Sequence, residues 1–307
     1  MRVAVIDCGT NTIRLLVADP GAEGTLAEVT RDLRLVRLGQ GVDATRTFHP
    51  DALARTFAAV DDYAATIRDL GVDRVRFLAT SAARDVTNRD ALFDGVRERL
   101  GIDVDVIAGE EEARLSFLGA LSGGPVDHGP MLVMDVGGGS TELIVGDLDG
   151  TIHAARSLDI GSVRLRERFL HSDPPSVSEV AEAHSYVADL IRGSGIPLAD
   201  VKTWIGVAGT TTSLSAMSQG LTAYDRRAVH NSTVEVAALQ GLADQLLAMP
   251  VAAVMERWPM LEPLRAEVIC AGAMICSEVS HAIGDDTGMT VRETDILDGA
   301  TLELLRR

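Results

Sequence analysis

Two stretches of the sequence resemble each other and decide the fold: residues 3–19 are VAVIDCGTNTIRLLVAD, and residues 131–147 are MLVMDVGGGSTELIVGD. At a constant spacing of 128 positions, each has an apolar run, an aspartate, a turn rich in glycine and hydroxyl residues, and a second apolar run. The matching pairs are Asp7 with Asp135, Gly9 with Gly137, Thr12 with Ser140, Leu15 with Leu143, Val17 with Val145 and Asp19 with Asp147. Self-similarity at a fixed spacing indicates an internal repeat, and two unrelated β-hairpins are the alternative explanation. The sequence therefore predicts two similar halves, each opening with a β-hairpin.

The rest of each half alternates strand and helix patterns, which is typical of an α/β fold. A connection rich in glycine and proline, residues 122–130, separates the halves. In the second half, apolar residues at helical spacing predict a long helix over 264–283. We therefore predict domains at 1–125 and 126–307 that face each other across a cleft. The final helix, about 295–307, is expected to pack back on the first domain.

The composition excludes several classes of function. The chain has 307 residues, of which 46% are hydrophobic and 24% charged, enough for two domains without disulfide or metal staples. A net charge of −17 argues against a general nucleic-acid or anionic-membrane binder, because such proteins carry a basic face. Lys202 is the only lysine, so the Gly-Lys-Ser/Thr sequence of a Walker-type phosphate loop is absent.

The cysteines and the N-terminus bear on the compartment. Cys8, Cys270 and Cys276 have the spacing of neither a disulfide framework nor a zinc site, which fits a reducing environment. The N-terminus enters a strand pattern directly, without a signal-peptide pattern. The longest apolar run, residues 268–276, is much shorter than the ~20 residues of a membrane span. We therefore expect a cytoplasmic protein that binds neither nucleic acid nor a membrane.

Both turns have the composition of a phosphate site. Glycine allows close approach to the backbone, and successive N–H groups of a turn form a concavity that suits phosphate oxygens. Asp7 and Asp135 can hold hydrated Mg²⁺ or another divalent cation against the phosphates, and Glu142 can complete that metal site. A tight hairpin with a capping aspartate would explain either turn alone. The predicted phosphate-binding residues of the two turns are Gly9, Thr10, Asn11, Thr12, Gly137, Gly138, Gly139, Ser140 and Thr141.

Five motifs together resemble the exopolyphosphatase / guanosine pentaphosphate phosphohydrolase (Ppx/GppA) family in its short two-domain form. They follow the family's order and span nearly the whole chain, and only their combination is specific. The motifs are DCGTNTIR at 7–14, ATSAAR at 79–84, GEEEAR at 109–114, DVGGGSTE at 135–142 and GVAGT at 206–210. The resemblance implies the superfold of actin, sugar kinases and heat-shock ATPases. In that α/β fold, two ribonuclease-H-like (actin-like ATPase) domains hold the active site in the cleft between them.

The resemblance also assigns roles to individual residues. It implies that Glu112 is the catalytic glutamate, which would deprotonate a water molecule. Glu111 is the alternative base, and acidic stabilisation of a helix start would explain the whole run without catalysis. Arg84 is assigned to the terminal phosphate, with a surface salt bridge as the alternative. Gly209 and Thr210 imply a further contact to phosphate or to a base.

The function implied by the resemblance is hydrolysis of phosphoanhydride bonds. The leading hypothesis is an Mg²⁺-dependent exopolyphosphatase, which releases orthophosphate from the end of inorganic polyphosphate by water attack. Guanosine pentaphosphate is the alternative substrate, and guanosine or adenine nucleotides are candidate substrates or regulators. A sugar or acetate kinase of the same superfold and a non-catalytic polyphosphate- or alarmone-binding protein are the competing classes. We also expect a homodimer, and a preference for short chains because the helical region of longer members has no counterpart here.

Overall fold

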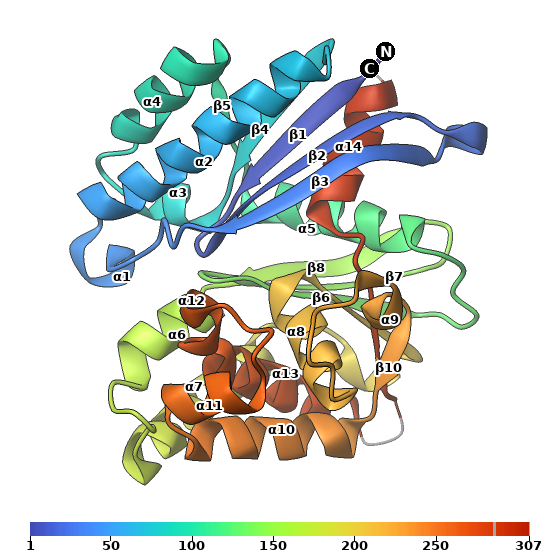
Figure 1. The fold of residues 1–307 in the computed structure, drawn as a ribbon. Coiled ribbons are helices and arrows are strands. Elements are labelled where there is room, and N and C mark those ends of the chain that lie inside the picture. Colours follow the sequence, from blue (N-terminus) through green and yellow to red (C-terminus); the bar gives the residue numbers. More distant parts are fainter. Residues whose placement is uncertain (285–286, 307) are drawn as a thin grey trace.

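The structure is a computed structural model, and it describes residues 1–284 and 287–306. Arg307, which the predicted second domain and final helix include, lies outside the described residues. Each half of the chain forms a β-sheet with helices packed around it, and the two sheets lie one above the other (Figure 1). The predicted α/β fold with two related domains is therefore confirmed.

The first half builds a mixed sheet with the strand order β3-β2-β1-β4-β5. Its long helix α2 begins where His49 caps the N–H of Asp51 and Pro50 occupies the first helical turn. In chain order, the elements are β1 (Val3–Cys8), β2 (Thr12–Pro20), the 3₁₀ helix η1 (Ala22–Gly24), β3 (Leu26–Leu35), α1 (Val42–Thr45), α2 (Pro50–Asp69), β4 (Arg74–Ala79), α3 (Ser81–Asp85), α4 (Asp90–Leu100), β5 (Val104–Val106) and α5 (Gly109–Ser122).

The second half builds a sheet with the order β10-β11-β9-β6-β7-β8, in which β9 and β11 run parallel to β6. Its helices cover the face of this sheet that is turned away from the first half (Figure 1). The elements are β6 (Met131–Val136), β7 (Thr141–Gly146), β8 (Ile152–Leu158), α6 (Ser162–Phe169), α7 (Val177–Gly193), the 3₁₀ helix η2 (Leu198–Asp200), β9 (Thr203–Val207), α8 (Ala208–Ser218), α9 (Arg226–Val229), β10 (Ser232–Val234), α10 (Val236–Ala248), α11 (Val251–Arg257), α12 (Pro263–Ala266), α13 (Ile269–Ile283), β11 (Met289–Val291) and α14 (Ile296–Arg306).

The internal repeat is present in the hydrogen-bonded registers of the two sheets. Asp7 of β1 lies opposite Arg14 of β2, and Asp135 of β6 lies opposite Glu142 of β7, at the same spacing of residues. The strands next to β1 and β6 on the other side, β4 and β9, run parallel to them. The predicted repeat is therefore structural, and both aspartates lie near the ends of equivalent central strands.

The turns between these strands also match. In the first turn, residues 9–12, the N–H of Gly9 donates to the carbonyl oxygen of Thr12 over 2.9 Å. In the second turn, residues 137–140, the N–H of Gly137 donates to the carbonyl oxygen of Ser140 over 3.0 Å. One hydrogen bond therefore closes each turn in the same way.

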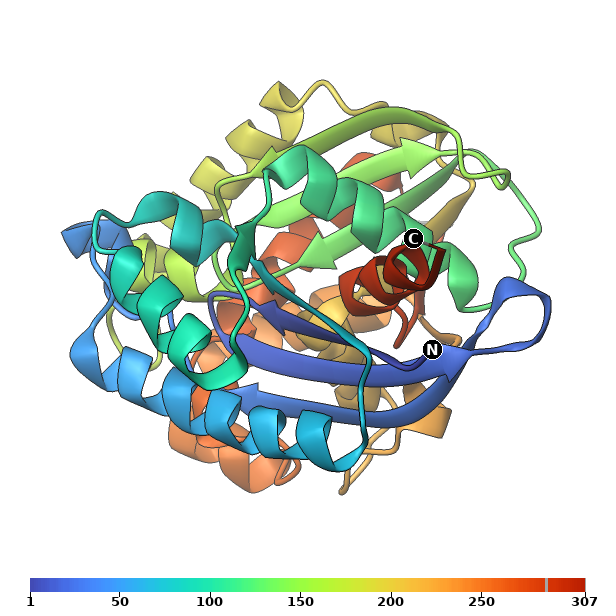
Figure 2. The same cartoon turned by 90° about the horizontal axis from the view of Figure 1, so that it is seen from above.

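The helices that end the two halves exchange places. α5 packs on β6, β7 and β8 of the second sheet, while α14 packs on β1 and β2 of the first and crosses α5. Glycines permit the close crossing, because a methyl group at Gly119 would lie 1.7 Å from the carbonyl oxygen of Asp295. Both helices lie between the sheets, and the chain ends lie close together (Figures 1 and 2). The predicted domain limits, 1–125 and 126–307, place α5 and α14 each in a different domain from the sheet that it covers. These limits stay a prediction.

One side of the cleft is closed by contacts from α6. Arg168 forms an ion pair with Asp43 at 2.5 Å, and Arg164 forms one with Asp85 of α3. The backbone N–H of Gly41 donates to the carboxylate of Glu167 over 3.1 Å. These contacts therefore join the two halves along this side of the cleft. In the part of the chain that the structure describes, no helix has the length and apolar character needed to cross a bilayer.

Candidate active site

The two glycine turns meet across the cleft. A methyl group at Gly138 would lie 3.0 Å from the Cβ atom of Thr10, and one at Gly139 would lie 2.6 Å from the hydroxyl oxygens of Thr10 and Ser81. Real Cβ atoms do not tolerate such distances, so glycine is required at both positions for this approach. The repeat thus brings a turn from each domain to the same place, as the sequence predicts.

A cavity of about 60 Å³ lies between the turns. Around it, buried polar atoms of the first turn and of Asp7 have no hydrogen-bond partner in the described structure: Asp7 Oδ1, Thr10 Oγ1, and both Oδ1 and Nδ2 of Asn11. Leaving a buried polar group unpaired costs roughly 1–3 kcal/mol, so ordered water, an ion or a ligand normally pairs it. The predicted site residues that line this cavity are Asp7, Gly9, Thr10, Asn11, Thr12, Glu112, Asp135, Gly137, Gly138, Gly139, Ser140 and Gly209.

Glu112 lies in the first turn of α5, with its carboxylate at the wall of the cavity. It is only 8% exposed, and its Oε2 atom accepts a hydrogen bond from Nη1 of Arg84 over 2.7 Å. Burial raises the pKa of Glu112 above the ordinary value, and the charge of Asp7 adds to this, while Arg84 opposes it. Glu111 instead bonds to Arg114 outside the cavity, through contacts of 2.7 Å. Glu112 is therefore the glutamate of this run that faces the cleft.

Arg84 lies next to the candidate base, Glu112. Its guanidinium lies beside the Glu112 carboxylate, and Nη1 also donates to the carbonyl oxygen of Ile107 over 3.0 Å. It is not among the described residues that line the cavity. This geometry suits a group that positions Glu112, and the predicted contact of Arg84 with the terminal phosphate stays a prediction.

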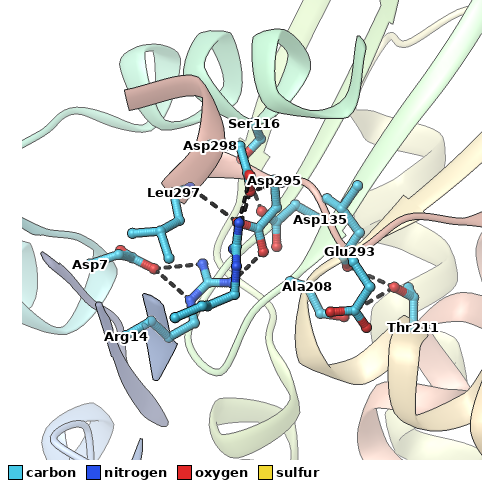
Figure 3. A network of polar contacts seen from close by, with 12 residues as sticks. Asp7, Arg14, Ser116, Asp135, Ala208, Thr211, Glu293, Asp295, Leu297 and Asp298 are labelled. Atoms are coloured by element: carbon cyan, nitrogen blue, oxygen red, sulfur yellow. Dashed lines mark hydrogen bonds and ion pairs between the residues drawn. The ribbon is translucent and has the colours of Figure 1, made fainter. Parts of the chain in front are cut away.

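Several further carboxylates surround the floor of the cavity (Figure 3). Arg14 lies between two of them, donating to Asp7 over 2.6 Å and pairing with Asp295, which precedes α14 (Figure 3). Asp135 accepts a hydrogen bond from the hydroxyl of Ser116 over 2.9 Å (Figure 3). Burial and the charge of Asp295 raise the pKa of Asp135 to about 7. Burial also raises the pKa of Asp7, against the opposing charge of Arg14.

The predicted metal ligands are only partly suited to that role. Among the residues that the structure describes, no group of three His, Cys, Asp or Glu side chains is arranged to hold a metal ion. Glu142 accepts from the hydroxyl of Ser157 over 2.7 Å and does not line the cavity. Burial, with the charges of Glu112 and Asp135, raises the pKa of Glu142 well above its usual range. Mg²⁺ is commonly held by one or two carboxylates and by substrate phosphates. Asp7, with its unpaired Oδ1, and Asp135 fit that pattern.

Two predicted phosphate ligands have hydroxyl groups that are engaged elsewhere. The Oγ1 of Thr141 donates to the carbonyl oxygen of Ile160 over 2.7 Å, and the Oγ1 of Thr210 donates to that of Val136 over 2.8 Å. Both side chains are buried and join neighbouring segments of the second half. Their hydroxyls therefore stabilise the backbone around the second turn, and a direct contact with phosphate stays a prediction.

Arg265 is a candidate site residue that the motifs did not reveal. It lines the cavity, is 9% exposed, and its guanidinium lies against the backbone of Gly209, where a methyl group would be 2.3 Å from Nη2. Burial and the charge of Arg14 lower the pKa of Arg265 to about 10. Within residues 1–284 and 287–306, no carboxylate pairs with this guanidinium, so it can accept an anionic ligand. Nothing in its local sequence separates it from a surface arginine.

A second cavity of about 480 Å³ adjoins the first. Both cavities are lined by Arg14, Leu33, Ala208, Gly209 and Arg265. The larger one continues past apolar side chains such as Leu35 and Met260. A ligand can therefore place one end between the two turns while the rest lies in the larger cavity.

Two repeated hairpins whose glycine turns meet over buried carboxylates define a two-domain phosphate-handling protein of the actin-like ATPase class. The sequence profile of the Ppx/GppA phosphatase family matches residues 16–307. The chain is 46% identical to a Mycobacterium tuberculosis protein named exopolyphosphatase 2, over 99% of this chain and 98% of that protein. The chain belongs to the Ppx/GppA phosphatase family, as its motifs predict.

Solved structures agree with this assignment. The crystal structure of an exopolyphosphatase-like protein superposes with a TM-score of 0.94 at 37% identity, covering 100% of this chain and 99% of the other. A Ppx/GppA family member from Aquifex aeolicus superposes with a TM-score of 0.83 at 29% identity, covering 100% and 98%. Members of the same family thus share the arrangement of both halves.

Proposed function

We propose that this protein is an exopolyphosphatase that hydrolyses the terminal phosphoanhydride bond of inorganic polyphosphate. The observation that carries the proposal is the set of buried, unpartnered polar atoms in the first turn and on Asp7, facing the glycine turn of the second domain. Such a pocket suits a terminal phosphoryl group, whose oxygens accept hydrogen bonds from backbone N–H groups. The relative named exopolyphosphatase 2 supports the same substrate.

The chemistry is attack by water on the terminal phosphorus. Glu112 accepts a proton as the water oxygen bonds to phosphorus, the bond from phosphorus to the bridging oxygen breaks, and orthophosphate leaves the shortened chain. The turns hold the phosphoryl oxygens, and Arg265 balances the negative charge of the next phosphates. Arg84 holds the Glu112 carboxylate in position. When bound, Mg²⁺ would be held by Asp7 and Asp135 and would neutralise phosphate charge.

The test is release of orthophosphate from polyphosphate, guanosine pentaphosphate and ATP, measured side by side with and without Mg²⁺. We expect turnover of polyphosphate that depends on a divalent cation. Binding of polyphosphate without turnover under every condition would instead indicate the non-catalytic class. Phosphorylation of a sugar or of acetate with ATP would indicate a kinase.

Guanosine pentaphosphate is the second candidate substrate, and the larger cavity favours it. Beyond Arg265, this cavity offers apolar side chains together with Tyr224 and the carboxylates of Glu28 and Glu262. An uncharged nucleoside with N–H donors would fit such a lining better than a continuous row of phosphates. Faster turnover of guanosine pentaphosphate than of every polyphosphate would make it the main substrate. The homodimer, the cytoplasmic location and regulation by nucleotides stay predictions.

A further inference from the structure

A third cavity adjoins the larger one. It has a volume of about 430 Å³ and is lined by residues of the β2–β3 hairpin, the end of α5, and α14. The larger cavity and the third cavity have three lining residues in common, Glu28, Arg31 and Arg226. These three side chains therefore form the partition between two spaces that would otherwise continue into each other.

The partition is made of ion pairs that cross the cleft. Glu28 belongs to β3 of the first half, and its Oε1 atom accepts from Nη1 of Arg226, on α9 of the second half, over 2.7 Å. The other oxygen of Glu28 accepts from Nε of Arg31 over 3.0 Å. Arg31 also pairs with Asp298 of α14 at 2.6 Å. Figure 1 shows α9 on the side of the molecule toward which the β2–β3 hairpin extends.

The charges differ between the two ends of the larger cavity. At the inner end, beside the turns, the guanidinium of Arg265 has no carboxylate partner among the described residues. At the partition, Arg226 and Arg31 are already paired, because Glu28 contacts both of them and Glu293 lies 3.4 Å from Nε of Arg226. Arg292 also lines the larger cavity, and its guanidinium donates to the side chain of Asn231 and to backbone carbonyl oxygens. The two ends therefore differ in one respect: the inner end has a guanidinium without a carboxylate partner in the part of the chain described, beside buried carboxylates, whereas Glu28 already engages Arg226 and Arg31 at the partition.

We propose that the Glu28–Arg226 ion pair is the end wall of the substrate cavity and limits the chain length of the polyphosphate that is hydrolysed, with Glu28 as a specificity-determining residue. The inference rests on the proposed function. A short chain fits between the turns and this wall. A longer chain must pass the Glu28 carboxylate, which repels its phosphates. The side chains of Glu28 and Arg226 are 36% and 40% exposed, so the pair contributes little to folding and can be changed without unfolding the protein.

Charge-selective variants test the wall. Glu28→Ala removes the repelling carboxylate and leaves Nη1 of Arg226 free to bind phosphate, while Nε stays near Glu293. We expect the ratio of kcat/KM for long chains to that for tri- and tetraphosphate to rise about threefold or more. Arg226→Ala breaks the same contact but keeps the carboxylate, so the ratio should not rise. The exchange Glu28→Arg with Arg226→Glu restores a pair and should bring the ratio back toward the wild-type value. Asp69→Ala is the matched control, because it removes one negative charge, as Glu28→Ala does, from an exposed position on α2. It should leave the ratio unchanged.

The outcomes separate the two proposals. If Glu28→Ala leaves the ratio unchanged, or if Glu28→Ala and Arg226→Ala raise it alike, the wall does not select by charge and the inference is wrong. If the wild-type protein releases phosphate from no polyphosphate of any length, the proposed function itself fails. Circular dichroism of each variant confirms that the fold is kept, and activity on triphosphate confirms that the catalytic cavity is intact.

Discussion

Glu112 is buried against Arg84 at the wall of the cavity between the two turns, and its carboxylate is the group there that we expect to accept a proton. Glu112→Gln keeps the shape of the side chain but removes the base. We expect kcat to fall by about 10²–10⁴-fold while polyphosphate binding persists. Phosphate release and calorimetric binding measure the two effects. Glu111→Gln, on the neighbouring residue outside the cavity, should keep most of the activity, and equal losses in both variants would contradict the role of Glu112.

We expect the pH dependence of the hydrolysis rate to depend on Arg84, the partner of Glu112. Burial raises the pKa of Glu112, and the guanidinium of Arg84 lowers it in opposition. The base acts only when deprotonated, so the rate falls as the pH drops through this pKa. Arg84→Ala removes the lowering influence, so the acidic limb of kcat/KM against pH should move to higher pH. An unchanged limb in a folded, active variant would show that another group controls it.

The protonation of Asp135 affects the free energy of unfolding of the protein. In the folded protein its pKa is raised to about 7, above that of an aspartate in the unfolded chain. Between these two values the folded state binds the extra proton, so the contribution of Asp135 to stability falls as the pH rises through this window. Asp135→Asn should therefore increase the free energy of unfolding at pH 8 by on the order of 1 kcal/mol or more, and change it less at pH 4. Urea unfolding without divalent cations measures this, and a loss of stability at pH 8 would contradict it.

At the residue level, the sequence predicts those site residues whose role depends on local turn chemistry. Gly138 and Gly139 belong to this group, because a turn that approaches another backbone needs glycine. Glu142 and Arg84 depend on distant partners, Ser157 and Glu112, which no local pattern reveals. Arg265 has no motif at all, and only the tertiary structure brings its side chain from α12 to the cavity, against Gly209 of α8.

Among the elements, the crossing of α5 and α14 is the most sensitive to side-chain volume. Methyl groups at Gly119 and Gly299 would lie 1.7 Å and 2.0 Å from the carbonyl oxygens of Asp295 and Leu115. Gly119→Ala or Gly299→Ala should therefore destabilise the protein by about 1–3 kcal/mol or more, as overpacked cores do. Gly241→Ala on α10, where no atom lies within 4 Å, should instead stabilise it by about 0.5–1 kcal/mol. Urea unfolding of the three variants gives the comparison, and similar values for all would rule out the tight crossing.

The boundaries of several helices cannot be predicted from the periodicity of apolar residues alone. The sequence predicts one helix over 264–283, whereas the structure has α12 at Pro263–Ala266 and α13 at Ile269–Ile283. The apolar pattern continues across the break, but Glu267 at this point pairs with Arg37 of the first half. The short helices α1, α9 and α11 were not predicted either, because so few residues contain little periodic signal.

On the scale of the whole molecule, the halves interlock. The predicted fragment 1–125 would lose α14, which covers β1 and β2, and would expose the face of α5 that packs on the second sheet. Separately expressed fragments 1–125 and 126–307 should therefore lack cooperative thermal unfolding, although each contains a complete sheet. Circular dichroism melting of each fragment and of their mixture tests this. Cooperative melting of either fragment near the wild-type Tm would show that the boundary near 125 separates independent domains.

The sequence by itself determined the repeat, the α/β class, the family and the two glycine turns, because each depends on short-range patterns of apolar residues, glycine and aspartate. Only the tertiary structure decided which glutamate faces the cleft, which hydroxyls are engaged by the backbone, and where Arg265 lies. It also decided that α5 and α14 exchange sheets. These features arise where segments far apart in the chain meet, and their burial and pairing are set by packing that no local pattern encodes.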